Sequence, residues 1–215
     1  MDDSSNSDHE LAQKARDGDR EAASQLVARY RDRLVKMVRL RMDRRLSKRV
    51  DASDIVQEAT LDAVQRFEQY LKKPDVDLFV WLRWIANDKL IDAHRFHLGT
   101  QKRQLGQEVS IFARPVAEAT SFALAEHLLG RLTSPTAALR AIETRSELEN
   151  ALNQLEPVDR EVLVLRHFEH LSNKETAEVL GLKKSGASRR YVEALKRLKE
   201  LLKDVPAFEE FFGAS

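Results

Sequence analysis

The chain has 215 residues, of which 42% are hydrophobic and 33% are charged, and it carries a net charge of +1. It contains no cysteine, which excludes disulfides and thiolate metal sites, and its six histidines lack the spacing of metal ligands, so no metal site is expected. The start MDDSSNSDHE is acidic and polar, and no apolar run reaches the roughly 18 residues of a membrane span, so we expect a cytoplasmic protein without membrane insertion.

The first part of the sequence predicts a series of helices. Residues 1–8 are expected to be disordered, and 9–28 to form a helix or a pair of helices broken near Gly18. The basic block from Arg29 to Arg49 keeps its apolar residues at helical spacing. A solvated outer face is therefore the simplest interpretation of its cations, and phosphate contact is the weaker one.

A helix that begins near Asp51 has two distinct faces. Its apolar residues recur every four positions and predict the buried face: Ile55, Ala59, Ala63 and Phe67. The other face is polar and acidic around one leucine: Asp51, Asp54, Glu58, Leu61 and Gln65. On the residues alone, a solvated face is favoured for this acidic stripe. The alternative is a docking surface for a basic helix of another protein.

The loop YLKKPDVD and the helix after it form the most aromatic part of the chain. Lys72 and Lys73 place two positive charges at the tip of the loop. The segment LFVWLRWIANDKLIDAHRFH contains both tryptophans, and four of its residues are predicted to pack inward: Leu78, Trp81, Leu82 and Ile85. Its polar residues are predicted to share another stripe: Arg83, Asn87 and His94, with Arg95 beside it. Cations interleaved with aromatic rings are typical of surfaces that bind single-stranded nucleic acid.

Residues 99–143 indicate a linker between two modules, because they have fewer charges, many small residues and two prolines. Helices resume in the second module, residues 144–205, where Pro157 suits the first turn of the segment PVDREVLVLRHFEH. The tail 206–215, PAFEEFFGAS, either folds back onto a module or binds a partner.

The stretch from Leu171 to Leu198 predicts a helix-turn-helix. Ser172 and Glu175 form a capping box, and Gly181 ends the first helix. The second helix is expected from about Ser185 to Lys203, with one apolar face: Ala187, Tyr191, Leu195, Leu198 and Leu202. Nine Lys/Arg stand against four Glu over 172–203, which suggests a phosphate-facing surface, while an ordinary solvated face is the alternative. Placement favours DNA binding, because the candidate contact residues crowd the turn and the first part of the second helix: Lys183, Lys184, Ser185, Ser188, Arg189 and Arg190.

Three stretches together resemble the extracytoplasmic-function (ECF) group of the sigma-70 family, the small bacterial sigma factors that keep only regions 2 and 4. They are DASDIVQEATLDAVQRF, FVWLRWIANDKLIDAHR and LEPVDREVLVLRHFEHLSNKETAEVLGL. The resemblance implies an all-α fold, with a region 2 bundle over 9–98 and a region 4 helix-turn-helix over 144–205. It implies a protein that is no enzyme, needs no cofactor and directs core RNA polymerase to promoters.

The resemblance also implies roles for particular residues. Five residues would bind the clamp helices of the largest polymerase subunit: Asp51, Asp54, Gln57, Glu58 and Leu61. The polymerase flap would be a further contact. Melted minus-10 bases would be captured by Lys72, Lys73, Arg83, Asn87, His94 and Arg95. The helix from Ser185 would recognise the minus-35 duplex, and an anti-sigma factor is an expected partner. The loop lacks the short glycine-containing form of relatives, and KKSGASRR replaces the usual S-x-G-T-V-K-S-R.

Two other functions remain alternatives. A stand-alone helix-turn-helix regulator accounts for Leu171 to Leu198 but leaves the acidic stripe and the aromatic helix without a purpose. The second alternative is a helical adaptor that binds only proteins, such as an inactive sigma-like decoy for an anti-sigma factor. Enzyme activity is disfavoured, because the sequence has no glycine-rich phosphate loop and no nucleophile–base set.

Overall fold

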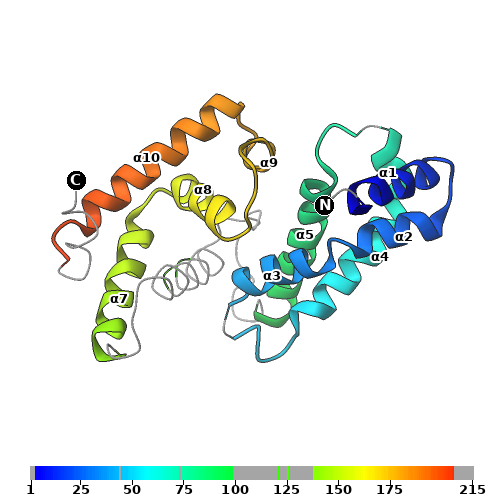
Figure 1. The fold of residues 1–215 in the computed structure, drawn as a ribbon. Coiled ribbons are helices and arrows are strands. Elements are labelled where there is room, and N and C mark those ends of the chain that lie inside the picture. Colours follow the sequence, from blue (N-terminus) through cyan, green and yellow to red (C-terminus); the bar gives the residue numbers. More distant parts are fainter. Residues whose placement is uncertain are drawn as a thin grey trace. The chain divides into compact units, whose positions relative to one another are not determined.

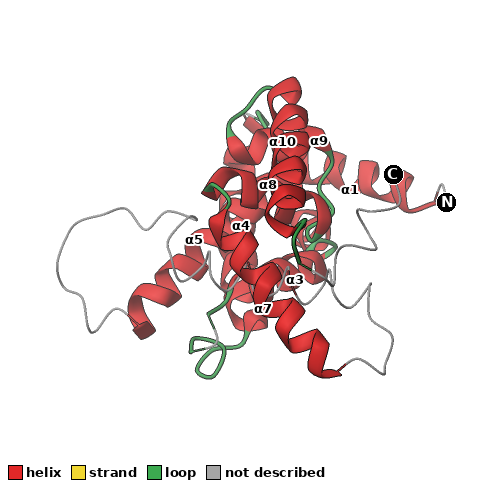
Figure 2. Ribbon diagram, turned by 90° about the vertical axis from the view of Figure 1, so that its left-hand side faces the viewer, coloured by secondary structure: helices red, strands yellow, loops and turns green. Residues whose placement is uncertain are grey.

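The computed structural model describes residues 3–43, 45–72, 74–98 and 138–205, together with Ser121 and Ala125. All regular structure in these residues is helical (Figures 1 and 2), which confirms the predicted all-α fold. The chain divides into two compact units, Met1–Val109 and Ser110–Ser215. Within the described ranges, no helix combines the length and the apolarity that crossing a bilayer requires.

The first unit is a bundle in which one long helix is central. Its described helices are α1 (Asp3–Arg16), α2 (Arg20–Ala28), α3 (Arg31–Arg41), α4 (Ala52–Lys72) and α5 (Leu78–Leu98). Helix α4 packs against α2, α3 and α5, and its buried face consists largely of the predicted residues Ile55, Ala59, Ala63 and Phe67. Leu82 and Ile85 of α5 are buried as predicted, while Leu78 and Trp81 are half-buried. Both faces of α4 therefore follow the sequence pattern.

The N-terminal helix starts earlier than the sequence predicts. Helix α1 begins at Asp3, so the prediction of disorder over 1–8 is wrong from Asp3 onward. A carboxylate at the first position suits the positive end of a helix dipole, which helps a polar segment to be helical without an apolar stripe. The predicted break is confirmed: Gly18, with φ of +94°, separates α1 from α2, and Asp19 caps α2 by accepting hydrogen bonds from two backbone N–H groups.

The second unit is organised around its last helix. Its described helices are α7 (Ala138–Gln154), α8 (Pro157–His167), α9 (Asn173–Leu180) and α10 (Lys184–Leu202), and α10 packs against the other three. The predicted capping box is present: the Glu175 N–H donates to Ser172 Oγ (3.2 Å), and the Ser172 N–H donates to Glu175 Oε2 (2.7 Å). Gly181 ends α9 with φ of +64°, a left-handed conformation that favours glycine. The helix-turn-helix is thus formed as the sequence predicts.

The buried face of α10 differs from the prediction at two positions. Ala194 is buried in place of Leu195, which is 38% exposed, and Tyr191 is only half-buried. Seven residues make almost two full turns of an α-helix, so Ala194 lies nearly in line with the buried Ala187. An eighth residue adds about 100° of rotation and turns Leu195 away from the core. Leu198 and Leu202 are buried as predicted.

Part of the predicted linker belongs to the second unit. Helix α7 begins at Ala138, inside the predicted range 99–143. Ser121 and Ala125 are buried, and the Arg160 guanidinium donates from Nη1 to Ser121 Oγ (3.3 Å). The rest of the predicted linker and the tail 206–215 lie outside the described residues.

Candidate nucleic-acid and protein interfaces

The acidic stripe forms one exposed face of α4. Asp51, Asp54, Gln57 and Glu58 are exposed, and Leu61 in their midst is 60% exposed. Asp51 accepts from the Ser53 N–H (2.7 Å) and from Ser53 Oγ (2.8 Å), and these hydrogen bonds lower the pKa of its carboxyl group. The stripe therefore combines negative charge with an apolar side chain that contributes little to the core of the unit.

The polar stripe predicted on α5 is not exposed. Arg83, Asn87 and His94 are all buried, and of the stripe only the neighbouring Arg95 is exposed, with an ion pair to Asp92 (3.5 Å). Helix α5 packs against α3 and α4 and has apolar residues on most of its sides, so its polar side chains turn into the bundle. The prediction that these three side chains form an exposed stripe is therefore wrong, and they offer little surface to a nucleic acid. Lys72 at the end of α4 is exposed, and Lys73 lies outside the described residues.

His94 is a buried residue whose burial disfavours the charged form of its imidazole. Desolvation lowers the pKa of its imidazole, and the nearby Asp43 carboxylate and a backbone hydrogen bond with Arg41 oppose that shift without cancelling it. Its Nε2 atom is buried and has no hydrogen-bond partner among the described residues. His94 is therefore a core residue whose protonation would cost folding energy.

An aromatic pocket lies where α4, the loop and the start of α5 meet. It encloses about 380 Å³ and is lined by Arg66, Gln69, Tyr70, Asp75, Val76, Trp81 and Trp84. The rings of Tyr70 and Trp81 stack with centroids 4.8 Å apart, and Tyr70 Oη donates to the carbonyl of Val76 (3.0 Å), which fixes the loop. Trp84 is 38% exposed. The sequence predicts that Trp81 packs inward, although two tryptophans three residues apart on one helix could have indicated an aromatic pocket.

The basic residues at the turn of the second unit are mostly exposed. Lys183, Lys184, Ser185, Ser188 and Arg189 all face solvent at the start of α10. The side-chain amide of Asn173 donates from Nδ2 to the carbonyl of Lys184 (2.9 Å), which ties the start of α10 to the start of α9. The turn therefore presents these groups from a fixed backbone.

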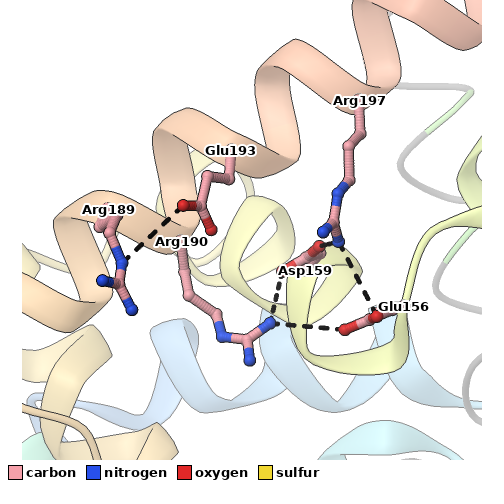
Figure 3. Close-up of polar contacts among 6 residues, drawn as sticks. All are labelled: Glu156, Asp159, Arg189, Arg190, Glu193 and Arg197. Atoms are coloured by element: carbon pink, nitrogen blue, oxygen red, sulfur yellow. Dashed lines mark hydrogen bonds and ion pairs between the residues drawn. The ribbon is translucent and has the colours of Figure 1, made fainter.

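Arg190 differs from its neighbours because it points toward α8 (Figure 3). It donates from Nη1 to Asp159 Oδ1 (2.9 Å) and lies 3.6 Å from Glu156 Oε2. Arg197, two turns later, also pairs with Asp159 and with Glu156. Asp159 is buried, and its hydrogen bond raises the pKa of Arg190. Arg189 instead faces outward beside Glu193 (3.8 Å).

The described residues contain no group of histidine and acidic side chains that could hold a metal ion.

The described residues offer three candidate binding surfaces. The acidic stripe and the aromatic pocket lie on the first unit, and the basic start of α10 lies on the second.

Comparisons with known proteins agree with this arrangement. The family model described as ECF sigma factor matches residues 7–204. The RNA polymerase sigma-H factor of Pseudomonas aeruginosa is 26% identical over 174 residues, which cover 80% of this chain and 82% of that relative. A solved structure, CnrH in complex with the cytosolic domain of CnrY, is similar with a TM-score of 0.53 and 25% sequence identity. That match covers 93% of this chain and 99% of CnrH.

Proposed function

The chain belongs to the ECF sigma factor family, and we propose that it binds core RNA polymerase and directs it to promoters by contacting two DNA elements. The observation that carries the proposal is that one chain holds two units with exposed surfaces of opposite chemistry. The first unit presents the acidic stripe of α4, and the second presents the basic start of α10. A protein that only binds duplex DNA has no use for the acidic surface.

The acidic stripe is proposed to dock on the clamp helices of the largest polymerase subunit. Asp54 and Glu58 supply charge that would steer a basic partner, and Leu61 supplies an apolar centre that a partner would bury. The burial of the opposite face against α2, α3 and α5 leaves this face available.

The aromatic pocket is proposed to capture an unstacked base of the melted minus-10 element. Stacking of a base on an aromatic side chain contributes about 1–3 kcal/mol, and the exposed ring of Trp84 offers such a face. Arg66, Gln69 and Asp75 line the same pocket and carry groups that can hydrogen-bond to a base edge. This assignment replaces the buried Arg83, Asn87 and His94, which we now propose as supports of the bundle, and it keeps Lys72 and Arg95 as candidate phosphate contacts.

The start of α10 is proposed to enter the major groove of the minus-35 duplex. Lys183, Lys184 and Arg189 would contact phosphates or bases, and Ser185 and Ser188 face the same side. Arg190 is withdrawn from this set, because its guanidinium is already hydrogen-bonded to Asp159.

A protein partner that covers these surfaces is also proposed. The similar chain CnrH was solved in complex with the cytosolic domain of CnrY, which supports a regulatory partner of the anti-sigma type for this chain. Regulation by such a partner would keep the polymerase-binding and DNA-binding surfaces apart from their targets until a signal releases them.

One experiment separates these proposals from their rivals. The purified chain is mixed with bacterial core polymerase, and run-off transcripts from genomic DNA are sequenced. Binding to core and defined start sites are expected. A chain that does not bind core but does bind duplex DNA would indicate a stand-alone regulator. Binding to core without initiation would indicate a decoy.

A further inference from the structure

The outward face of α10 is mostly polar but carries an exposed valine, and Leu195 at the edge of that face is 38% exposed. Val192 is 48% exposed. Its neighbours on that face, at helical spacing, are exposed and polar: Ser185, Ser188, Arg189 and Lys196. A β-branched residue is a weak helix former, and a valine on this face adds little to the core. A single exposed valine is ordinary on a protein surface and by itself indicates no function. The inference therefore depends on the position of Val192 on the helix that is proposed to bind DNA.

The position of Val192 along α10 is suited to contact with base pairs. Helix α10 begins at Lys184, and recognition helices contact base edges with their N-terminal part. Val192 follows Ser188 by four residues, which is about 6 Å along the helix axis. That distance corresponds to roughly two base pairs along a DNA duplex. Val192 would therefore reach bases next to those contacted from Ser188.

Cationic side chains on both sides of Val192 would bind phosphates and keep the valine close to the major groove. Arg189 precedes it by three residues and Lys196 follows it by four, so both lie beside it on the helix surface. The ion pair of Arg189 with Glu193 is long and exposed, and such pairs exchange readily for other partners. Arg190 does not compete for this face, because it is turned toward Asp159 on α8 (Figure 3).

The chemistry of valine restricts what it can recognise. Its side chain has no hydrogen-bond donor or acceptor, so it cannot distinguish the polar edges of bases. The only apolar group that a base pair presents in the major groove is the C5-methyl group of thymine. We propose that Val192 is a specificity-determining residue that contacts a thymine methyl group in the minus-35 duplex. This inference rests on the proposed entry of α10 into the major groove.

The test removes the thymine methyl group from the DNA and, separately, the valine side chain that is proposed to contact it. The holoenzyme is reconstituted with core polymerase, and a promoter found by start-site mapping is prepared with each minus-35 thymine replaced in turn by deoxyuridine. At one position, the wild-type holoenzyme should bind the deoxyuridine promoter about fourfold more weakly than the thymine promoter, as expected for the loss of one buried methyl group. Val192→Ala should bind the thymine and deoxyuridine forms of that position equally well.

Two variants control for indirect effects. Val192→Thr keeps a methyl group at the same place and should retain a preference for thymine. Leu201→Ala truncates another exposed apolar residue of α10, half a turn away around the helix, and should behave as the wild type does. Circular dichroism and thermal unfolding of each variant check the fold.

The outcomes separate this inference from the function on which it rests. A Val192→Ala holoenzyme that keeps the wild-type preference for thymine would overturn the inference, and so would a wild type indifferent to every deoxyuridine. In both cases specific promoter binding would persist and the proposed function would stand. A holoenzyme that binds no duplex selectively would overturn both.

Discussion

Asp159 of α8 is a buried carboxylate that pairs with two arginines of α10. A buried carboxylate is tolerated when its charge is paired and hydrogen-bonded, and here two arginines from one helix meet this need. Arg190 is 35% exposed and Arg197 half-exposed, so water screens part of each interaction. The pairs therefore stabilise the packing of α10 on α8 less than fully buried pairs would.

Replacement of this carboxylate should destabilise the second unit. Asp159→Asn is expected to lower its free energy of unfolding by about 1–3 kcal/mol, because both guanidiniums lose the buried carboxylate and keep only the exposed Glu156 as a charged partner. Denaturant unfolding followed by circular dichroism measures the change. Arg189→Ala is the matched control, since that arginine forms only a long surface pair, and it should cost less than about 0.5 kcal/mol. Equal losses in the two variants would contradict this role of Asp159.

The burial of His94 predicts that the stability of the first unit depends on pH. Burial lowers the pKa of His94 below its ordinary value of 6.5, so on acidification the unfolded chain takes up the proton before the folded chain does. The free energy of unfolding should therefore fall as pH drops through 6.5, by at most about 1.4 kcal/mol per pH unit. Urea unfolding between pH 7.5 and 5.5 measures the slope, and His94→Gln should flatten it. An unchanged slope in that variant would place the pH dependence elsewhere.

At the scale of the element, α4 has two faces of opposite chemistry. Its buried face packs against three helices of the first bundle, while its acidic stripe remains exposed around Leu61. Because substitutions on the stripe remove little from the core, the proposed docking of this face can be tested without unfolding the bundle.

Changes on the acidic stripe should weaken polymerase binding and leave the fold intact. Asp54→Arg and Leu61→Arg are each expected to weaken core binding at least about tenfold, since one reverses a complementary charge and the other places a charge in an apolar contact. Affinity for core is measured by fluorescence anisotropy. Glu21→Arg, the same change of charge on the exposed side of α2, should retain the wild-type affinity. Core binding that is unaffected by the α4 variants would refute the docking assignment.

The sequence predicts helices well where one face alone is apolar. The faces of α4, the capping box of α9 and the turn at Gly181 are all correct, because each follows from local spacing or backbone chemistry. Helix α5 is apolar on most sides, so spacing could not show that Arg83 and Asn87 turn inward. The partner of Arg190 was equally hidden, since Asp159 lies 31 residues away in the chain. The aromatic pocket joins residues from two helices and a loop, which periodicity does not connect.

At the scale of the whole molecule, the boundary between the two units is earlier than the sequence indicates. The second unit begins at Ser110, and buried residues as early as Ser121 contribute to it. The segment predicted as a linker is therefore in part structural. Two units on one chain also suit the proposed function, in which two weak DNA contacts become strong when the polymerase holds both units at once.

Fragments should reveal this boundary. A fragment of residues 110–215 is expected to be more stable than one of residues 144–215 by at least about 1 kcal/mol. The shorter piece loses the first turns of α7 and the hydroxyl that accepts from Arg160. Thermal unfolding of the two fragments compares them, and Ser121→Ala in the full chain isolates the hydroxyl. Equal stability of both fragments would restore the boundary at 144.

The pairing of Asp159 with two arginines also bears on how the protein would search DNA. Affinity for a duplex falls with salt according to the number of phosphates that protein cations neutralise, because each contact releases counterions. Arg190 and Arg197 already pair with carboxylates within the unit. The number of basic residues on α10 therefore exceeds by two the number of cations that remain available to phosphates. A carboxylate that never touches DNA would thus weaken binding to random sequence, and would shorten the time spent on genomic sites that lack a promoter.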